Sequence, residues 1–382
     1  MNAPVFVFDP TRLRGLYDEV RALRAEVDAS LGPDDLAHLK KIEGWGRIAT
    51  TVGLATAWIA PNPLSAVALS LGRSTRWLLM HHCGHRGYDK VPGVEARYTS
   101  EVFAQGPRRW RDWPDWMLPA AWNYEHNILH HHHTGERRDP DLIERNVAWL
   151  NRPEVPRALR WALLGALGFT WKASYYAPNT LRVWLHRHDP KGARPSTTRA
   201  QRVKMLLRES YGPYIARRFV GLPLAYLPLG PWAMFSALCN SVMGEALSNF
   251  HTFFVVGPNH TGDDLYRFDD RPQSKDEYLA RQIIGSVNYR TGGDLNDYAH
   301  LWLNYQIEHH VFPDIPMLKY RQVQPKVRAL CEKYGLPYVQ APVWQRFRKM
   351  AEVFVGSQTM RRMTRVGDAA AAAAVDLSAV QA

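Results

Sequence analysis

The sequence predicts an all-α integral membrane protein, in which two helical hairpins, four transmembrane helices in all, carry a helical cap on the cytosolic side. Three observations predict it: uncharged apolar runs come in two pairs, an uncharged turn rich in Pro or Gly interrupts each pair, and basic residues precede both. The chain also holds 14 Trp and 17 Tyr, whose amphipathic rings suit a membrane interface. A mean hydropathy of −0.35 indicates that a large polar part accompanies the membrane part.

The first pair of apolar runs covers residues 48–60 and 64–72, separated by Pro-Asn-Pro at 61–63. Each run alone is shorter than the roughly 20 residues that a membrane span needs. We therefore expect the two spans to extend over about 44–60 and 62–80.

The second pair covers 219–230 and 231–257, and predicts spans at about 213–230 and 232–257. By the positive-inside rule, the two uncharged turns face away from the cytosol and both termini face it. This places the chain in an inner or cytoplasmic membrane. The alternative interpretation is that the two hairpins are buried in the core of a soluble protein. The flanking basic residues are Lys40, Lys41 and Arg47 before the first pair, and Arg217 and Arg218 before the second.

Outside the hairpins, the chain divides into three parts. Residues 1–42 are polar with charges spaced as on a solvated helix, which predicts an N-terminal cytosolic helical segment. Residues 43–345 form the main domain, in which 158–178, flanked by Arg and rich in aromatic residues, is expected to lie in the membrane interface. Residues 346–382 form a C-terminal tail that is expected to be partly disordered, because 366–382 is of low complexity.

Charge and cysteine usage narrow the function. The net charge of +12 suits an anionic surface such as phospholipid head groups. Nucleic acid is not expected as a partner, because Lys and Arg are spread along the flanks of apolar helices. Three cysteines far apart, with no CxxC, do not predict a disulfide framework.

The histidines form clusters at helical spacing. Residues four apart share one face of a helix, so each cluster can aim two or three imidazoles at one point. Neutral imidazole suits Fe, Zn, Cu and Ni, and the ligands are too many for one tetrahedral zinc. Two metal ions, each with open coordination positions, fit the number of candidate ligands better. The clusters are His81 with His85, His126 with His130 and His131, and Gln306 with His309 and His310.

The clusters also share a position relative to the hairpins. The first two follow the first hairpin, whereas His260 and the third cluster follow the second. With four spans, all of them fall on the cytosolic side, where they can converge on one site.

On these residues, the chain resembles the membrane-bound fatty acid desaturases and their lipid hydroxylase relatives. It carries that family's HxxxH, HxxxHH and QxxHH boxes, as well as TGERRDPD after the second box and HHVFPDIPMLKYRQVQPKV after the third. The similarity covers about residues 45–345, and the Gln-first third box is similar to that of front-end and acyl-lipid desaturases. The resemblance implies four membrane spans over a helical cap that holds two iron ions, with O2 as co-substrate. The implied metal site consists of His81, His85, His126, His130, His131, His260, Gln306, His309 and His310.

Many front-end members carry a fused cytochrome b5 domain with an HPGG motif. This sequence has no HPGG, so no fused haem domain is expected. The electrons are expected from a separate donor of ferredoxin or cytochrome b5 type with its reductase.

Several further side chains are candidates for ligands, or for groups that orient the ligands. An ordinary surface salt bridge remains an alternative for the carboxylates, as does a satisfied polar contact for the histidines. His132 and His133 are expected to face solvent or to support the second box, and Glu245 either pairs with a polar group or senses the lipid. The candidates are His251, His300, Asp139, Asp141 and Glu308.

The leading hypothesis for function is an O2-dependent desaturase that introduces a C=C double bond into a fatty acyl chain or lipid. A lipid or carotenoid hydroxylase or ketolase on the same scaffold is the alternative. A membrane protein that binds or transports metal is a second alternative, although the histidines follow the apolar runs instead of lining a path through them.

Overall fold

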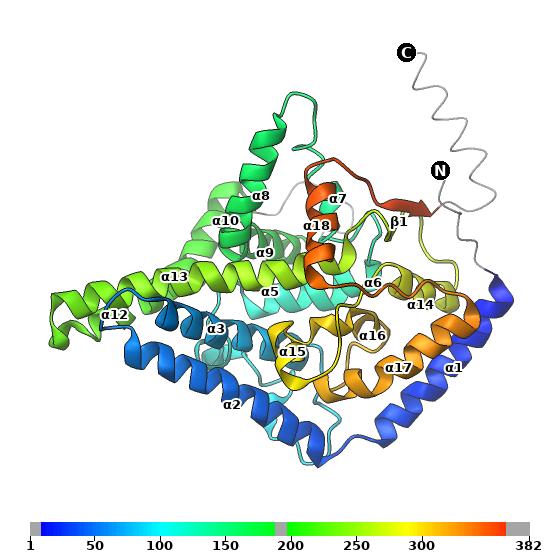
Figure 1. The fold of residues 1–382 in the computed structure, drawn as a ribbon, viewed down its shortest axis with the longest axis horizontal. Helices are drawn as coiled ribbons and strands as arrows, with labels where there is room; N and C mark the ends of the chain where they lie inside the picture. Colours follow the sequence, from blue (N-terminus) through cyan, green and yellow to red (C-terminus); the bar gives the residue numbers. More distant parts are fainter. Residues whose placement is uncertain (1–8, 188–196, 364–382) are drawn as a thin grey trace.

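The computed structural model describes residues 9–187 and 197–363, and these ranges are mostly helical (Figure 1). The low-complexity segment that was predicted at 366–382 lies outside the described residues. The predicted N-terminal helical segment forms α1 (Pro10–Ala29), where the Asp9 carboxylate accepts hydrogen bonds from the first backbone N–H groups.

The first pair of apolar runs forms α2 (Pro33–Thr56) and α3 (Pro63–Gly84), which pack along each other. Asn62 caps α3 by accepting a hydrogen bond from the backbone N–H of Ser65. Gly46 permits the close approach of the two helices, because a Cβ atom there would lie 2.5 Å from Thr75. The opposite side of α3 packs on α13 (Pro231–Val256).

The second pair begins with a continuous helical stretch. It leads through a 3₁₀ turn, η7 (Leu227–Leu229), to Gly230, whose φ of 104° turns the chain into α13. Figure 1 shows the end of this stretch beside the start of α13 and next to the α2–α3 turn, at the left of the molecule. The stretch consists of α10 (Arg199–Met205), η5 (Leu206–Tyr211), α11 (Gly212–Ile215), η6 (Ala216–Gly221) and α12 (Leu222–Leu224), of which η5 and η6 are π-helical.

The helices differ from the predicted spans in extent. α2 begins at Pro33 instead of 44, and α3 continues to Gly84 instead of ending near 80. Within 9–187 and 197–363, none of the helices is both long enough and apolar enough to cross a membrane. The four spans therefore remain a prediction.

Glu245 of α13 is paired inside the helix bundle, which favours its predicted pairing with a polar group over lipid sensing. Its carboxylate accepts hydrogen bonds from Trp116 Nε1 at 2.7 Å, from Asn249 Nδ2 at 3.0 Å and from the Tyr214 hydroxyl. Arg73 Nη1 of α3 lies 3.3 Å from the same carboxylate. This buried network joins α3, α13 and the segment before the second histidine cluster.

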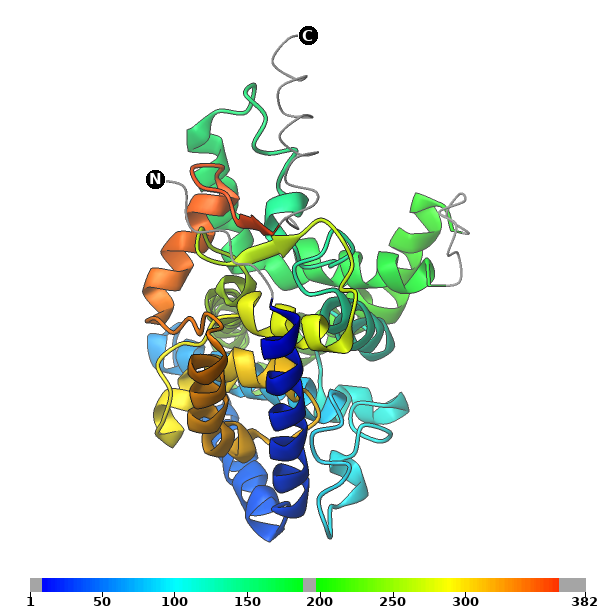
Figure 2. The same ribbon diagram turned by 90° about the vertical axis from the view of Figure 1, so that its right-hand side faces the viewer.

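The cap is assembled from both ends of the chain. Figure 2 shows α1 beside the C-terminal helices, and α1 packs on α14 (Lys275–Ile284) and α17 (Met317–Tyr334). A short parallel sheet pairs β1 (Tyr266–Phe268) with β2 (Arg361–Met363), in register Tyr266↔Arg361. α18 (Val343–Phe354) crosses the predicted domain boundary at 345 and buries Met350 and Phe354.

The predicted interfacial segment 158–178 forms three consecutive elements. They are α8 (Arg157–Trp171), the π-helical η4 (Lys172–Tyr176) and the start of α9 (Ala177–Leu185). The remaining helices are short: α4 (Arg109–Asp112), α5 (Pro119–Asn123), α6 (His131–His133), α7 (Ile143–Asn146), α15 (Asp294–Ala299) and α16 (Gln306–Val311), with the π-helical η3 (Tyr124–His130) and the 3₁₀ turns η1 (Ala96–Tyr98), η2 (Gly106–Arg108), η8 (Gly257–His260) and η9 (Leu303–Tyr305).

Candidate metal centre

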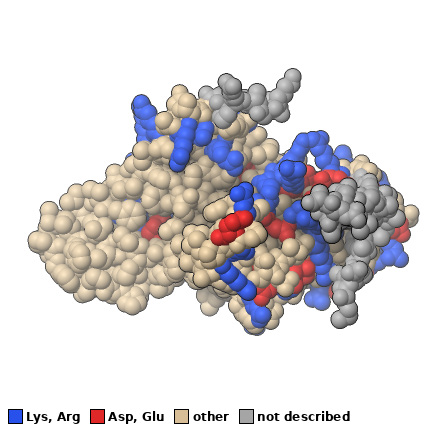
Figure 3. Space-filling model, turned by 90° about the horizontal axis from the view of Figure 1, so that it is seen from above, with Lys and Arg blue, Asp and Glu red and all other residues tan. Residues whose placement is uncertain are grey.

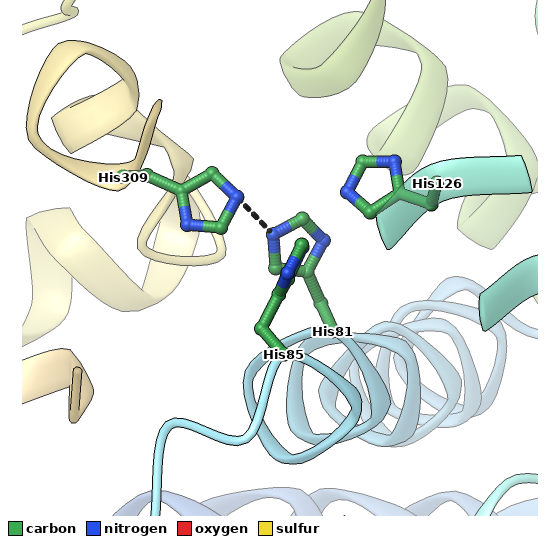
Figure 4. A group of neighbouring side chains, drawn as sticks. All are labelled: His81, His85, His126 and His309. Carbon is green, nitrogen blue, oxygen red and sulfur yellow. Dashed lines mark hydrogen bonds between the residues drawn. The ribbon is translucent and has the colours of Figure 1, made fainter. Parts of the chain in front are cut away.

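Four buried histidines from three elements form the first group. His81 lies in the last turn of α3 and His85 is its C-cap residue, His126 lies in η3 and His309 lies in α16. Each offers one ring nitrogen, and these four atoms all lie within 4.8 Å of one another. Figure 4 shows the four rings turned toward a common point, with His81 Nε2 and His309 Nε2 3.0 Å apart. The convergence gives a site for one metal ion.

Three further histidines form the second group. Ring nitrogens of His130, His260 and His310 lie within 4.8 Å of one another. Gln306 Nε2 lies 2.9 Å from His260 Nε2, and its Oε1 accepts a hydrogen bond from Asn259. This group has one imidazole fewer than the first and has an amide at its edge, so the two groups are unequal.

His131 lies between the two groups. Its Nε2 is 3.2 Å from His309 Nε2 of the first group, and its ring stacks on that of His310 of the second, with centroids 4.3 Å apart. The structure thus brings together all the residues of the implied metal site.

The clusters of the sequence do not map one to one onto the groups. His126 joins the first group and its box neighbour His130 joins the second, and His309 and His310 divide in the same way. The second cluster nevertheless keeps two of its imidazoles near one point, because ligand atoms of His126, His130 and Asp141 also lie within 4.8 Å of one another. His309 and His310 are consecutive and point to different sides of α16, which places them in different groups. His126 and His130 follow each other along π-helical η3, with their rings stacked at 5.2 Å.

Hydrogen bonds at Nδ1 hold four of these rings. His130 Nδ1 lies 2.9 Å from Asp139 Oδ1, His310 Nδ1 lies 2.9 Å from Gln282 Oε1, and His260 Nδ1 lies 3.0 Å from the carbonyl of Gly285. An imidazole that donates from Nδ1 keeps the Nε2 lone pair free for a metal ion. His309 Nδ1 has the Tyr320 hydroxyl at 3.1 Å. Gln282, Gly285 and Tyr320 were missed from the sequence, because no spacing connects α14 and α17 to the boxes.

The protonation of the rings suits metal binding. Burial, followed by repulsion from neighbouring imidazoles, holds the pKa of His81, His126 and His309 well below the usual value, so these rings are neutral at neutral pH. Burial also lowers the pKa of His260 to about 3. For His130, burial lowers the pKa but the Asp139 carboxylate outweighs it, and the pKa is raised.

Unpaired nitrogens give a direct test of whether the cluster fits a metal. Among the described residues, His126 Nδ1 and Nε2, His85 Nε2 and His310 Nε2 are buried without a hydrogen-bond partner. Such orphaned polar atoms are costly in a protein interior unless another group satisfies them. Imidazole nitrogens of this kind are ligands for iron, zinc or copper, so the residues fit metal ions.

The three candidate carboxylates differ in whether they contact the histidine groups. Asp139 holds His130, and Asp141 offers a carboxylate oxygen within 4.8 Å of nitrogens of His126 and His130. Glu308 was expected to orient histidines. Its carboxylate instead accepts hydrogen bonds from Asn288 Nδ2 at 2.7 Å and from the Tyr338 hydroxyl at 2.8 Å, because it leaves α16 away from the cluster.

Two candidate histidines lie outside both groups. His251 lies 3.1 Å from Ser74 Oγ and donates to the carbonyl of Ala299 at 2.7 Å, and His300 Nδ1 donates to the carbonyl of Asn296. At the second box, His132 is exposed and His133 Nδ1 pairs with Glu136, which agrees with the expectation for both.

A cavity of about 350 Å³ lies against the cluster. Its wall contains two histidines of each group and Gln306, and is otherwise mostly apolar and aromatic. A mostly apolar wall with a few polar groups is typical of a pocket for an apolar ligand. The lining includes Trp77, His81, His126, His130, Ile143, Val147, Trp149, Leu150, Leu163, Leu167, Trp171, Phe253, His260, Leu303, Gln306 and Phe354.

Fold and site together define a helical protein whose buried histidine cluster can hold two metal ions at the wall of an apolar cavity. The sequence model described as "Fatty acid desaturase" matches residues 56–342. The chain therefore belongs to the fatty acid desaturase family, and it is an oxidoreductase.

Named relatives agree with this family. The chain is similar to "NADPH-dependent stearoyl-CoA 9-desaturase" of Mycobacterium tuberculosis (strain ATCC 25618 / H37Rv), with 27% identity over 345 residues that cover 85% of this chain and 75% of the relative. It is 23% identical to "Fatty acid desaturase 3" of Bos taurus, over 76% of this chain and 60% of the relative. It is 28% identical to "Acyl-lipid (7-3)-desaturase" of Diacronema lutheri, over 76% and 58% respectively.

Proposed function

We propose that the enzyme is an O2-dependent desaturase that introduces a C=C double bond into a fatty acyl chain, with two iron ions in the histidine cluster. The observation that carries this proposal is the apolar cavity whose wall includes His81 and His126 of the first group and His130 and His260 of the second. An acyl chain in this cavity would present saturated carbons to both metal groups.

Iron would supply the oxidising chemistry, in which O2, two electrons and two protons take two hydrogens from adjacent CH2 groups and leave as two waters. The residues of the chain do the rest. Neutral imidazoles offer their Nε2 lone pairs, while Asp139, Gln282 and the Gly285 carbonyl hold the Nδ1 protons. The aromatic and aliphatic wall excludes water from the acyl chain.

The apolar cavity supports a fatty acyl substrate, and the names of the relatives support it as well. The relatives' names specify stearoyl-CoA in one case and acyl lipids in another. Both are fatty acyl chains on a polar carrier. Removal of two hydrogens by O2 needs two more electrons, and we propose that a separate donor of ferredoxin or cytochrome b5 type with its reductase supplies them.

We further propose that the two helix pairs insert into an inner or cytoplasmic membrane, with the histidine cluster and both termini on the cytosolic side. Figure 3 shows that the left end of the molecule presents almost no charged side chain on the face in view, whereas Lys and Arg gather elsewhere. Water-exposed apolar surface of this size is unfavourable, and lipid would cover it. Exposed large apolar side chains of the two helix pairs and their turns include Ile48, Val52, Trp58, Ile59, Leu64, Val67, Val220, Leu224, Leu227, Leu229, Trp232, Phe235 and Val242.

Product mass tests the reaction. Cells that express the enzyme are fed a perdeuterated saturated fatty acid, and the labelled acyl chains are analysed by mass spectrometry. Loss of two deuterium atoms without gain of oxygen is the expected result. Gain of one oxygen atom would instead assign a hydroxylase or ketolase, in which the same site inserts oxygen. The inactive control is His126→Ala, which removes a ring of the first group.

A further inference from the structure

The chain enters the third histidine box through a strained turn. Leu301 and Trp302 are both buried, and both have a positive φ, of 54° and 55°. Bulky side chains rarely adopt this left-handed conformation, and two in succession persist only where the surrounding structure holds them. Contacts from outside the turn are therefore needed to keep it in place.

The carboxylate of Asp297 supplies such contacts. It is fully buried, and its Oδ1 accepts hydrogen bonds from Asn304 Nδ2 at 2.7 Å and from the backbone N–H of Gly292 at 3.0 Å. Its Oδ2 accepts a hydrogen bond from the Tyr305 hydroxyl at 2.9 Å. The backbone carbonyl of Asp297 accepts a further bond from the N–H of Trp302 at 2.8 Å. These donors lie before, within and after the strained turn, so Asp297 joins its two ends.

The same carboxylate fastens the turn to α17. Arg321 of α17 donates to Asp297 Oδ2 from Nε at 3.0 Å and from Nη2 at 2.6 Å. Figure 1 shows α15, which contains Asp297, beside α17. The preceding residue of α17, Tyr320, has its hydroxyl 3.1 Å from Nδ1 of His309. Asp297 thus connects the turn to a helix that contacts a candidate ligand.

The residues after the turn form part of the cavity wall. Leu303 and Gln306 both line the acyl cavity, and Gln306 lies at the edge of the second histidine group. The two residues between them are Asn304 and Tyr305, whose side chains both bond to Asp297. A loss of these bonds would therefore displace the cavity wall next to the metal groups.

We propose that Asp297 is a positioning residue for the reaction. Through the turn at 301–302 it holds Leu303 against the acyl chain, and it thereby sets which pair of carbons lies beside the metal groups. This inference rests on the proposed function for its reaction. The anchoring of the turn by Asp297 is independent of the chemistry.

Hydrogen exchange tests the anchoring without any turnover. Asp297→Asn keeps the size of the side chain, removes the charge opposite Arg321 and replaces one acceptor oxygen by an NH2 group. Backbone amides of 292–305 are expected to exchange at least about tenfold faster than in the parent.

Asp294→Asn is the matched control for this measurement. Asp294 lies in the same helix and pairs with the same Arg321 at 2.8 Å, but its other ion pair leads to Lys41, away from the turn. Exchange of 301–305 is expected to match the parent. Parental exchange in Asp297→Asn, or equal acceleration in both variants, would overturn the anchoring.

The position of the double bond tests the effect on the reaction. One saturated acyl substrate is converted by each enzyme, and the double bond is located by mass spectrometry of the dimethyl disulfide adducts. Asp297→Asn is expected to spread the double bond over neighbouring positions and to lower kcat by about tenfold or more, with KM within about threefold of that of the parent. Asp294→Asn is expected to keep the parental position, with kcat within about twofold.

A merely structural role would lower the amount of active enzyme without moving the double bond. The parental double-bond position in Asp297→Asn, at any rate of turnover, would therefore overturn the positioning role. If Asp297→Asn does not fold, Tyr305→Phe takes its place with the same expected spread, because it removes a single hydroxyl that bonds to Asp297. If the parent forms no unsaturated product, the proposed function fails, while hydrogen exchange still decides the anchoring.

Discussion

Asp139 gives the sharpest single-residue prediction for the metal centre. Its carboxylate takes three hydrogen bonds, from His130 Nδ1 at 2.9 Å and from the backbone N–H groups of Gly135 and Asp141, each at 2.9 Å. In Asp139→Asn, one carboxylate oxygen becomes an NH2 group. If the amide oxygen keeps His130 and Asp141, the NH2 faces the N–H of Gly135, and a buried donor loses its acceptor.

The size of the effect follows from these contacts. An unsatisfied buried donor costs about 1–3 kcal/mol in folding free energy. Loss of a carboxylate that orients a ligand imidazole weakens metal binding by about 10- to 100-fold, which corresponds to about 1.4–2.7 kcal/mol. Asp139→Asn is therefore expected to release iron to a competing chelator at about 10- to 100-fold lower chelator concentration than the parent.

Glu136→Gln is the matched control. Glu136 is also buried and its carboxylate lies 3.0 Å from a histidine, but that histidine, His133, belongs to neither group. The iron affinity of the Glu136→Gln variant is expected to stay within about twofold of that of the parent. The reasoning is refuted if Asp139→Asn retains parental iron affinity, or if both variants weaken it equally.

Three more predictions concern other parts of the molecule. Gln306→Ala is expected to lose most desaturase activity but keep most iron, because Gln306 contacts His260 at the edge of the second group; activity within about twofold of the parent, with electron donor in excess, would remove Gln306 from the site. Glu245→Gln is expected to lower the free energy of unfolding by about 3–5 kcal/mol, because it leaves the buried guanidinium of Arg73 without its counter-charge; a thermal unfolding midpoint equal to that of the parent would contradict this. Burial lowers the pKa of His38 to about 4, so the folded state favours neutral His38 and its contribution is complete above about pH 6.5 and is lost as the pH falls toward 4, by about 3 kcal/mol. His38→Gln is therefore expected to flatten the decline in stability between pH 6.5 and pH 4, and an unchanged slope would show that His38 does not contribute.

The residues of the candidate site could be predicted because their spacing and order are local properties of the sequence. His81 and His85 are four residues apart at the end of α3, and both contribute to one group. The division of the second box between the two groups could not be predicted, because it depends on the π-helical turn Tyr124–His130. No local sequence pattern distinguishes that turn from an α-helix of the same residues.

The side chains that hydrogen-bond to the candidate ligands could mostly not be predicted from the sequence. Gln282 contacts His310 and Tyr320 contacts His309 only because α14 and α17 pack around α16. Glu308 was a candidate by its place in the third box, but its direction on α16 takes it to Asn288 and Tyr338. The fold could likewise be predicted only in part. The apolar runs predicted where α2, α3 and α13 lie, but the ends of these helices depend on caps and tertiary packing.

Iron content tests the central claim most directly, namely that the two histidine groups each hold an iron ion. The parent enzyme, purified and reconstituted with iron, is measured by metal analysis together with the variant His126→Ala, His130→Ala, which removes one ring from each group. His251→Ala is the control, because His251 bonds to Ser74 and the Ala299 carbonyl, away from both groups. About two irons per chain are expected in the parent and the control, and far less in the double variant, with the helical content of all three unchanged. Full iron occupancy in the double variant, or a parent that binds no iron, would contradict the account.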